Sequence, residues 1–475
     1  MWHSDPIKRS GRSSASSTTL RSRPQSTNSF SFLLLLTIIT LLFSSSSTST
    51  THAATYEVQV HRPTTQTTTS KGLGGNAGHL FQSKYLGNTI LTNARNLGYT
   101  GTIVLGTPPQ SFQVVFDTGS DMIVITSDQC QGTHCKDMPH YTCNSCTKTP
   151  YSYNITYGDG TWGAGPIVAD TVAIGGLVIH NQQILDVTRS ALDLSSYGAG
   201  VAGLVGLMPN SPVLNAVPPL ANIYKEKLLD MNVFSVYLSP SLKSRQGGSF
   251  LFGGIDNTKF TGTLNQVPIS AGVGTAKGMW YIDADGAFSG SIPVPGYSKA
   301  PWLFDTGTSF IAVPTAFADA FHRGVPGASY STADQVYYVP CSGNTTFGIS
   351  FNGIKYEVPY LDYVATAGSH SGAPVCVSLI MPLGNYEMYI LGDPFLRQVY
   401  AVYDFTAGAS RIGIAPINVT SNSLGDEGLS GDPVPGGAVI TPISSNGASE
   451  RREQSIRWST LAAAVVASLL LSTFV

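Results

Sequence analysis

A seven-residue segment occurs twice in this chain, and the repetition restricts the fold more than any other feature. Val114–Ser120 reads Val-Val-Phe-Asp-Thr-Gly-Ser, and Trp302–Thr308 reads Trp-Leu-Phe-Asp-Thr-Gly-Thr. Each copy is an apolar, strand-like run that leads into an Asp-Thr-Gly triplet. The repetition predicts two similar halves, each of which presents one aspartate at the end of a strand.

A second element follows each copy at nearly the same distance. Leu204-Val-Gly206 ends 89 positions after Asp117 (206 minus 117), and Ile390-Leu-Gly392 ends 87 positions after Asp305 (392 minus 305). Two ordered elements at matching spacing indicate duplicated lobes. We expect the boundary between the lobes near residue 260, after a Gly-rich turn.

The composition favours short strands over long surface helices. The chain has 475 residues, of which 42% are hydrophobic and only 11% charged, and it contains 50 glycines. Long surface helices use straight-chain charged residues, which are scarce here. Tyr99–Leu105, a Gly-Thr-Pro-Pro turn and Ser111–Phe116 predict a β-hairpin that leads into Asp117. The net charge of −2 gives no support for nucleic-acid binding.

The two aspartates suit the hydrolysis of peptide bonds at acid pH. That reaction needs a base to activate water and an acid to protonate the leaving nitrogen, and two adjacent carboxyls that share one proton supply both. Like charges in contact cannot both ionise, so their pKa values move apart and the pair titrates as a unit. We therefore expect Asp117 and Asp305 to be the catalytic pair.

The residues after each aspartate are expected to support it. Gly119 and Gly307 let the backbone approach the carboxylate and give it a main-chain donor. The hydroxyl groups of Ser120 and Thr308 can donate to the outer carboxylate oxygens. Thr118 and Thr306, which lie between the aspartate and the glycine of each triplet, are expected to tie one loop to the other.

Over Tyr99 to Pro416 the chain resembles the pepsin-like family of bilobal aspartic proteases. Besides the two Asp-Thr-Gly loops, the motifs that carry the resemblance are Tyr99-Thr-Gly-Thr-Ile103, Gly106-Thr-Pro-Pro-Gln110, Tyr157-Gly-Asp-Gly160, Phe234-Ser-Val-Tyr-Leu238 and Ile390-Leu-Gly-Asp-Pro-Phe395. The resemblance implies a mostly β, two-lobed fold with the active-site cleft between the lobes. It also implies a monomeric aspartic endopeptidase that acts on polypeptides without a cofactor or metal.

By the same resemblance, Tyr157, Gly158 and Asp159 lie on a flap that closes over the substrate. Asp121–Val124 lacks the tryptophan that often holds the flap tyrosine in the family, so how Tyr157 is held stays open. A carboxylate at Asp159 can pair with a Lys or Arg before the cut. Alternatively, Asp159 only caps the turn, a role that Asp often plays.

Six cysteines fit an oxidising secretory route. Cys130 with Cys135, and Cys341 with Cys376, resemble two disulfides of the family, and Cys143 with Cys146 forms an extra close pair. Nested pairing of Cys130 with Cys146 and Cys135 with Cys143 is the alternative. Zinc binding is disfavoured, because no partner histidine pattern accompanies the cysteines.

Both ends of the chain indicate secretion to the cell surface. We expect a signal peptide over residues 1–54, with an uncleaved signal anchor as the alternative. A pro-segment, or a disordered linker, is expected over 55–90, in which only Tyr56–Val60 is strand-like. The lobes then span 91–260 and 261–417. A flexible stalk over 418–448 precedes a removed glycolipid-anchor signal over 449–475, with attachment at Asn446. The alternative for this tail is a C-terminal membrane helix.

Three Asn-X-Thr sequons agree with the same route, although such sequons arise by chance in a Thr-rich chain. They begin at Asn154, Asn344 and Asn418.

The rival function is a catalytically silent, cleft-binding protein on the same scaffold. Both intact Asp-Thr-Gly loops argue against it. A cell-wall glycoprotein would not explain the paired loops, and no Gly-X-Ser-X-Gly motif supports a serine hydrolase.

Overall fold

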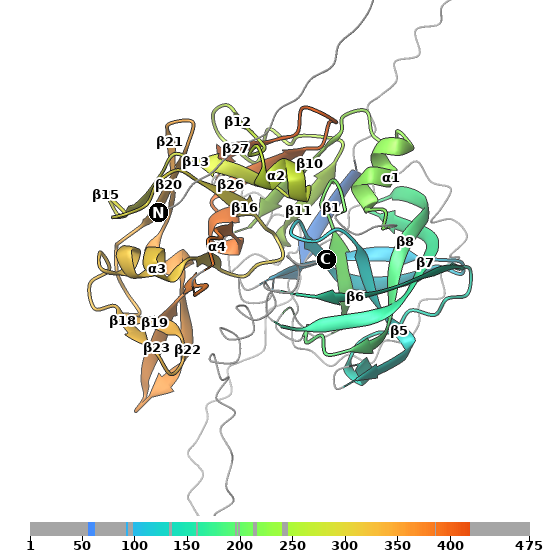
Figure 1. The fold of residues 1–475 in the computed structure, drawn as a ribbon, viewed down its shortest axis with the longest axis horizontal. Coiled ribbons are helices and arrows are strands. Elements are labelled where there is room, and N and C mark those ends of the chain that lie inside the picture. Colours follow the sequence, from blue (N-terminus) through green and yellow to red (C-terminus); the bar gives the residue numbers. More distant parts are fainter. Residues whose placement is uncertain are drawn as a thin grey trace, which may run out of the picture. The chain divides into compact units, whose positions relative to one another are not determined.

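The computed structural model describes residues 56–61, 92–93, 98–132, 135–157, 160–194, 197, 200–211, 216–239, 246–384 and 386–418. All of them belong to one compact unit, Ala53–Val475. Most of these residues are in strands, so the predicted mostly β fold is confirmed (Figure 1). The predicted signal peptide, anchor signal, Asn446, and most of the pro-segment and stalk lie outside the described residues. No helix in the described ranges is long and apolar enough to cross a membrane.

An eight-stranded sheet forms most of the first lobe, in the order β2-β3-β4-β9-β5-β8-β7-β6. Its strands are β2 (Thr92–Asn93), β3 (Tyr99–Leu105), β4 (Gln110–Asp117), β5 (Ile123–Gly132), β6 (Thr147–Thr156), β7 (Trp162–Ile174), β8 (Leu177–Ser190) and β9 (Val201–Gly206). The 3-10 helix η3 (Cys135–Asp137) and the helix α1 (Pro219–Lys225) accompany it. Strands β3 and β4 pair antiparallel, which confirms the predicted hairpin before Asp117.

The second lobe contains three smaller sheets. The five-stranded one has the order β13 (Tyr281–Ala284), β16 (Ala300–Phe304), β25 (Ile390–Leu391), β17 (Ile311–Val313) and β24 (Ile380–Pro382). One four-stranded sheet has the order β15 (Ile292–Pro293), β14 (Gly286–Ser289), β20 (Phe347–Phe351) and β21 (Ile354–Val358). The other has the order β18 (Ser329–Ser331), β19 (Val336–Val339), β23 (Ala373–Ser378) and β22 (Val364–His370). The helices here are α2 (Val273–Lys277), α3 (Thr315–His322), η5 (Tyr360–Asp362) and α4 (Asp393–Leu396).

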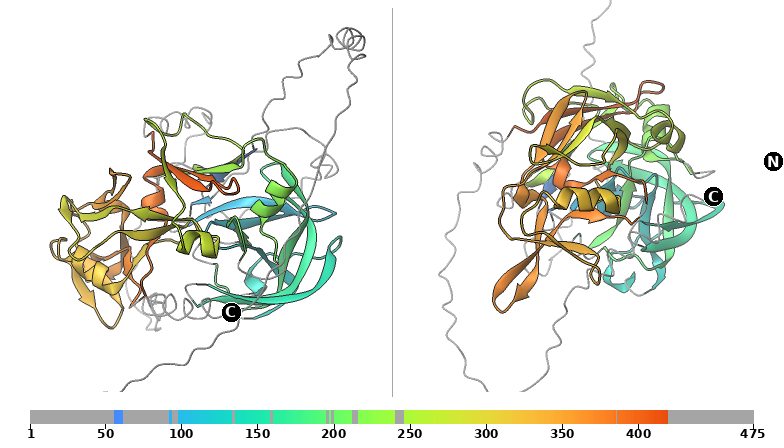
Figure 2. Two further views of the ribbon diagram at one scale, coloured as in Figure 1. Left: turned by 45° about the horizontal axis from the view of Figure 1, so that its top comes forward. Right: turned by 60° about the vertical axis from the view of Figure 1, so that its left-hand side comes forward.

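A six-stranded sheet takes its strands from both sides of residue 260. Its order is β1 (Tyr56–His61), β11 (Gln246–Phe252), β10 (Val233–Leu238), β26 (Val399–Asp404), β27 (Arg411–Pro416) and β12 (Asn265–Pro268). The strand-like stretch Tyr56–Val60 is therefore a strand, and it pairs with β11 at the edge of this sheet. Figure 2 shows the strands of the first lobe, blue to green, and those of the second lobe, yellow to orange, grouped on different sides.

The two repeated elements lie side by side in each lobe. Strand β4 runs parallel to β9, with Asp117 opposite Gly206. Strand β16 runs parallel to β25, with Phe304, the residue before Asp305, opposite Leu391. A parallel pair needs a crossover connection of about a dozen residues or more between its strands. The spacing of nearly 90 residues seen in the sequence satisfies this need in both lobes. The duplicated lobes predicted from the repeat are thus present as the same strand pairing.

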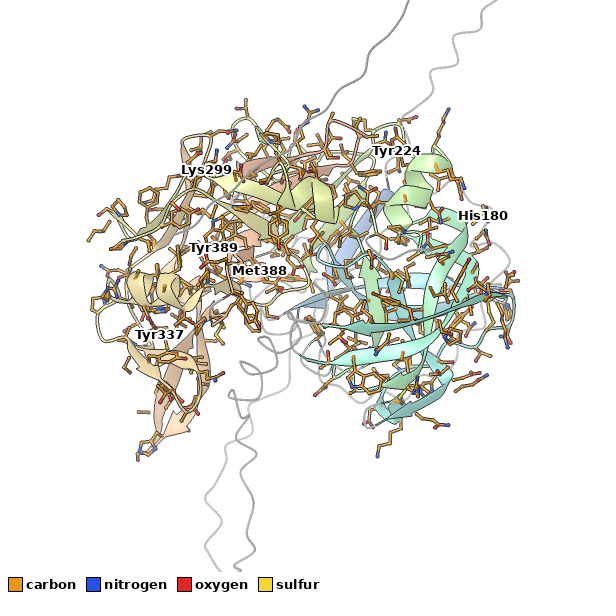
Figure 3. All side chains as sticks on the ribbon, in the orientation of Figure 1. His180, Tyr224, Lys299, Tyr337, Met388 and Tyr389 are labelled. Carbon is orange, nitrogen blue, oxygen red and sulfur yellow. A yellow bond between two sulfur atoms is a disulfide. The ribbon has the colours of Figure 1, made fainter. Side chains whose placement is uncertain are left out.

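Aromatic packing anchors the strands that lead to both aspartates. Phe116 stacks on Phe250 of the six-stranded sheet, with ring centroids 5.0 Å apart. Trp302 is fully buried and packs against Tyr389, which is labelled in Figure 3, at 4.7 Å between centroids. Buried aromatic pairs add directional contacts to the area they remove from water. The strands that lead to the aspartates are therefore held by aromatic contacts in both lobes.

Candidate active site

The two Asp-Thr-Gly loops meet and are held together by their threonines. The Thr118 amide donates to Thr306 Oγ1 (3.1 Å), and the Thr306 amide donates to Thr118 Oγ1 (3.0 Å). Each hydroxyl also donates across the junction: Thr118 Oγ1 to the Phe304 carbonyl (2.8 Å), and Thr306 Oγ1 to the Phe116 carbonyl (2.7 Å). All four bonds are buried and join segments nearly 190 residues apart, which fixes the separation of the aspartates.

Each glycine of the triplets supplies a donor to its own aspartate and leaves space for the other. The Gly119 amide donates to Asp117 Oδ1 (2.8 Å), and the Gly307 amide donates to Asp305 Oδ1 (2.9 Å). A Cβ atom on Gly119 would lie 2.7 Å from Asp305 Oδ2, and one on Gly307 would lie closer still to Asp117 Oδ1. The sequence predicted that each glycine lets the backbone approach a carboxylate closely. In the structure, the carboxylate for which each glycine leaves space is that of the opposite loop.

The hydroxyl residues beside the two aspartates differ. Thr308 Oγ1 donates to Asp305 Oδ2 at 2.6 Å. Ser120 Oγ is buried and makes no hydrogen bond of ordinary geometry to another described residue, but it lies close enough to Asp117 to lower the pKa of that carboxyl. The structure thus gives Asp305 a firmly held hydroxyl donor and gives Asp117 a weaker one.

Asp117 holds its proton more strongly than an ordinary aspartate. The side chains of Asp117 and Asp305 are only 6% and 7% exposed. Burial raises the pKa of Asp117 well above its usual value, and the adjacent Asp305 charge raises it further. The donors Ser120 and Gly119 act in the opposite direction without offsetting the rise. At a pH where two isolated aspartates would both be ionised, the pair can therefore still hold one proton.

Asp393 is a third buried carboxyl near Asp305, and the sequence reasoning did not single it out. Its amide donates to the Thr308 carbonyl (2.9 Å), and neither of its carboxylate oxygens has a hydrogen-bond partner among the described residues. Burial raises the pKa of Asp393 well above the usual value; the charge of Arg397 lowers it, and that of Asp305 raises it. One sequence feature could have pointed to this residue. The position directly after Ile390-Leu-Gly392 is an Asp, whereas the corresponding position of the first lobe, after Leu204-Val-Gly206, is Leu207.

Tyr157 directly follows the last residue of β6, at the hairpin with β7. Its amide donates to the Thr161 carbonyl (2.8 Å), and its carbonyl accepts from the Gly160 amide (2.9 Å). The ring packs against a buried apolar cluster that includes Met122 and Val124. Apolar packing against this cluster is thus one way in which Tyr157 is held. Gly158 and Asp159 lie outside the described residues.

Tyr197 also reaches the site and was missed by sequence reasoning. Its hydroxyl donates to the Gly307 carbonyl at 2.9 Å, across 110 positions of the chain. No motif or repeat marks this tyrosine, and only the folded arrangement brings it to the second Asp-Thr-Gly loop.

Three disulfides link the six cysteines. Cys130 pairs with Cys135, Cys143 with Cys146, and Cys341 with Cys376. The nested pairing of the first four cysteines is therefore wrong, because each bonds its nearer neighbour. The disulfides fit an extracellular protein. Within the described residues, no group of His, Cys, Asp and Glu is arranged to hold a metal ion.

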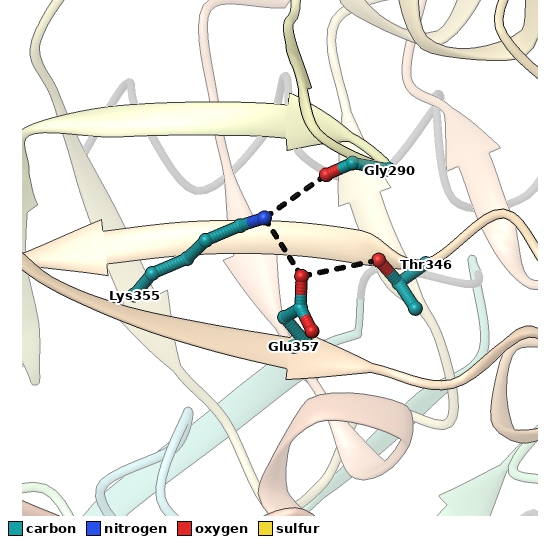
Figure 4. Close-up of polar contacts among 4 residues, drawn as sticks. All are labelled: Gly290, Thr346, Lys355 and Glu357. Carbon is teal, nitrogen blue, oxygen red and sulfur yellow. Dashed lines mark hydrogen bonds and ion pairs between the residues drawn. The ribbon is translucent and has the colours of Figure 1, made fainter.

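The three sequon asparagines differ in their surroundings. Asn154 on β6 and Asn344 are exposed. Thr346, the third residue of the Asn344 sequon, donates to Glu357 at 3.4 Å, beside the exposed ion pair of Glu357 with Lys355 (Figure 4). Asn418 is half-buried, and its side-chain amide donates to the Thr258 carbonyl (3.2 Å). A glycan at Asn418 would have to replace that contact.

Comparisons with known proteins agree with this geometry. A model of the family described as eukaryotic aspartyl protease matches residues 98–417. Pepsin A of Rhinolophus ferrumequinum is 34% identical over 337 residues, which are 69% of this chain and 83% of that protein. Pepsin A of Canis lupus familiaris is 34% identical over 345 residues, 70% of this chain and 84% of that protein. Pepsin A of Sus scrofa is 30% identical over 339 residues, with the same coverage. The chain therefore belongs to the eukaryotic aspartyl protease family and is an aspartic endopeptidase, a hydrolase.

Proposed function

We propose that this endopeptidase cleaves polypeptides with a water activated between Asp117 and Asp305, and that it works best at acid pH. The observation that carries the proposal is the meeting of two buried carboxyls, each against the glycine of the opposite loop, with the pKa of Asp117 raised. A carboxyl that keeps its proton can act as an acid, while its ionised neighbour acts as a base. Acid pH favours this singly protonated pair.

The proposed reaction assigns one role to each aspartate. Asp305, the ionised partner, takes a proton from the water, and the water oxygen bonds to the carbonyl carbon of the substrate. Asp117 gives its proton to the carbonyl oxygen, which yields a tetrahedral diol. When the carbon–nitrogen bond breaks, the proton held by Asp305 passes to the leaving nitrogen, and Asp117 recovers one from the diol. The products are a carboxylic acid and an amine.

The test replaces each aspartate without changing its shape. Asp117→Asn and Asp305→Asn should each abolish cleavage of a diverse peptide mixture across a range of pH, because the pair acts as a unit. Asp137→Asn removes an exposed carboxylate and should leave cleavage unchanged. A transition-state mimic of the aspartic class should inhibit the wild type. Normal cleavage by either buried variant would contradict the mechanism and favour a different catalytic group.

Substrate preference is proposed to depend on the flap. We assign Tyr157, Gly158 and Asp159 to a hairpin that closes over the peptide, and we expect Asp159 to favour a Lys or Arg before the cut. Support comes from the position of Tyr157 at the start of the turn between β6 and β7. Asp159→Thr should lower the ratio of cleavage at Lys to cleavage at Leu, and an unchanged ratio would leave Asp159 as a turn residue.

The enzyme is further proposed to be a secreted, glycosylated monomer that is made as a zymogen and tethered to the cell surface. The three disulfides and the exposed Asn154 and Asn344 support a secretory route. The pairing of β1 with β11 supports a pro-segment over 55–90 that docks on the six-stranded sheet before its removal. The tether rests on the glycolipid-anchor signal over 449–475 and attachment at Asn446.

A further inference from the structure

The side chain of Tyr197 crosses from the first lobe to the second Asp-Thr-Gly loop. Its hydroxyl donates to the Gly307 carbonyl at 2.9 Å. Gly307 is two positions after Asp305, and its amide donates to Asp305 Oδ1. Tyr197 therefore hydrogen-bonds the carbonyl of a residue whose amide already contacts the carboxylate of Asp305.

The ring of Tyr197 is braced for this contact. Gly98 lies so close to the ring that a Cβ atom there would be 2.7 Å from Cε1 and would overlap Cδ1. The ring also packs against the apolar cluster that Tyr157 contacts. The Tyr197 amide donates to the Leu194 carbonyl (3.0 Å), which fixes the backbone. A ring held in this way presents its hydroxyl in one direction.

The bond to Gly307 fixes the peptide group that joins Gly307 to Thr308. A peptide group is planar, so a bond to its carbonyl also sets the direction of its N–H and of the next residue. The next residue is Thr308, whose hydroxyl donates to Asp305 Oδ2 at 2.6 Å. The carbonyl of Thr308 is fixed separately by the amide of Asp393 (2.9 Å).

Near Asp117, an aromatic side chain of the second lobe donates to a backbone carbonyl of the first lobe, as Tyr197 does in the opposite direction. The Trp280 ring, from the second lobe, donates through Nε1 to the Leu207 carbonyl (2.8 Å). The Leu207 amide in turn donates to the Asp117 carbonyl (2.7 Å). Each aspartate is thus linked to an aromatic side chain of the opposite lobe through one intervening residue. Trp280 is fully buried, whereas Tyr197 is half-buried.

We propose that Tyr197 is a positioning residue for the peptidase reaction. Its hydroxyl orients the Gly307–Thr308 peptide and, through the Thr308 hydroxyl, the carboxylate of Asp305. The proposal rests on the assignment of Asp305 as the base in the proposed function. It predicts that the hydroxyl is needed for the rate of the chemical step and not for folding or for substrate affinity.

The test removes only the hydroxyl. In Tyr197→Phe we expect kcat to fall about three- to tenfold, the size of effect that one neutral hydrogen bond supports, with KM unchanged. The acid limb of the kcat profile should move to higher pH, because a poorly oriented Thr308 donor stabilises the singly charged aspartate pair less. Rates are expressed per active site titrated with a tight transition-state mimic, so that misfolded enzyme is not counted. Tyr224→Phe, an exposed tyrosine of α1, should change nothing.

A double-mutant cycle tests the route through Thr308. In a Thr308→Ala background, Tyr197→Phe should change kcat less than about twofold. An equal loss in both backgrounds would overturn the proposal, as would an unchanged kcat and pH profile. A lower KM with a higher kcat would also overturn it, because the hydroxyl would then be competing with substrate. Failure of the proposed function itself is recognised separately, by full cleavage in Asp305→Asn.

Discussion

His322 contributes to the dependence of protein stability on pH, and we expect its replacement to remove that contribution. The ring is buried at the end of α3, and its Nδ1 lies 2.7 Å from the Ala318 carbonyl. A carbonyl only accepts, so Nδ1 carries the hydrogen and Nε2 is left bare, with no hydrogen-bond partner among the described residues. Burial lowers the pKa of His322 to about 4, although the Ala318 carbonyl and the Asp319 charge act to raise it.

The size and sign of the effect follow from this pKa. Below its ordinary value of 6.5, the unfolded chain binds a proton that the folded protein rejects until the pH reaches about 4. Stability therefore falls as the pH drops through this interval, by about 3 kcal/mol in total. His322→Phe keeps a flat ring to stack on Tyr337, labelled in Figure 3, whose ring centroid lies 3.7 Å away. Relative to wild type, this variant should gain about 3 kcal/mol between pH 7 and pH 4.

The assay is denaturant unfolding at closely spaced pH values, with both proteins carrying Asp117→Asn to prevent self-digestion. The difference between the two curves isolates His322, because the other titrating groups are shared. His370→Phe replaces an exposed histidine of β22 and should give a flat difference. A flat difference for His322→Phe as well would refute the reasoning, since it would mean that the buried ring accepts a proton as readily as the unfolded chain does.

Three further outcomes are expected. Gly307→Ala places a methyl group against the Asp117 carboxyl and should lower kcat by about a hundredfold or more while circular dichroism stays unchanged; near-normal activity would contradict the close approach. Burial raises the pKa of Asp393, so its ionisation costs stability as the pH rises above its ordinary value of 3.8. Asp393→Asn should therefore gain stability relative to wild type from pH 4 to pH 7, and unfolding curves that stay parallel would argue against this. A phospholipase specific for glycolipid anchors should release the enzyme from cells, whereas retention with the Ser459–Val475 peptide in the mature protein would favour a membrane helix.

The repeated segments carried most of what could be predicted from the sequence. The Asp-Thr-Gly triplets and the Leu-Val-Gly and Ile-Leu-Gly elements are local patterns, and they predicted two lobes. The hairpin before Asp117 was predicted from a different local pattern, two apolar runs joined by the Gly-Thr-Pro-Pro turn. Tyr197 and His322 could not be found in this way, because their contacts depend on packing between segments that carry no shared pattern. The environment of Asp393 was equally out of reach, since an Asp in sequence does not reveal burial without partners. The pairing of Cys143 with Cys146 was open for the same reason.

The order of the six-stranded sheet has a consequence for the making of the protein. Strand β10 pairs with β26, and Tyr400 of β26 donates to Ser235 of β10 at 2.6 Å across 165 positions. During synthesis, β10 emerges long before β26 exists, so the edge of β10 that pairs with β26 stays open at least until the ribosome has passed Asp404. An open strand edge is a template for pairing with another chain. The nascent enzyme is therefore most exposed to aggregation in that interval, and a fragment that ends near residue 260 would keep the open edge permanently.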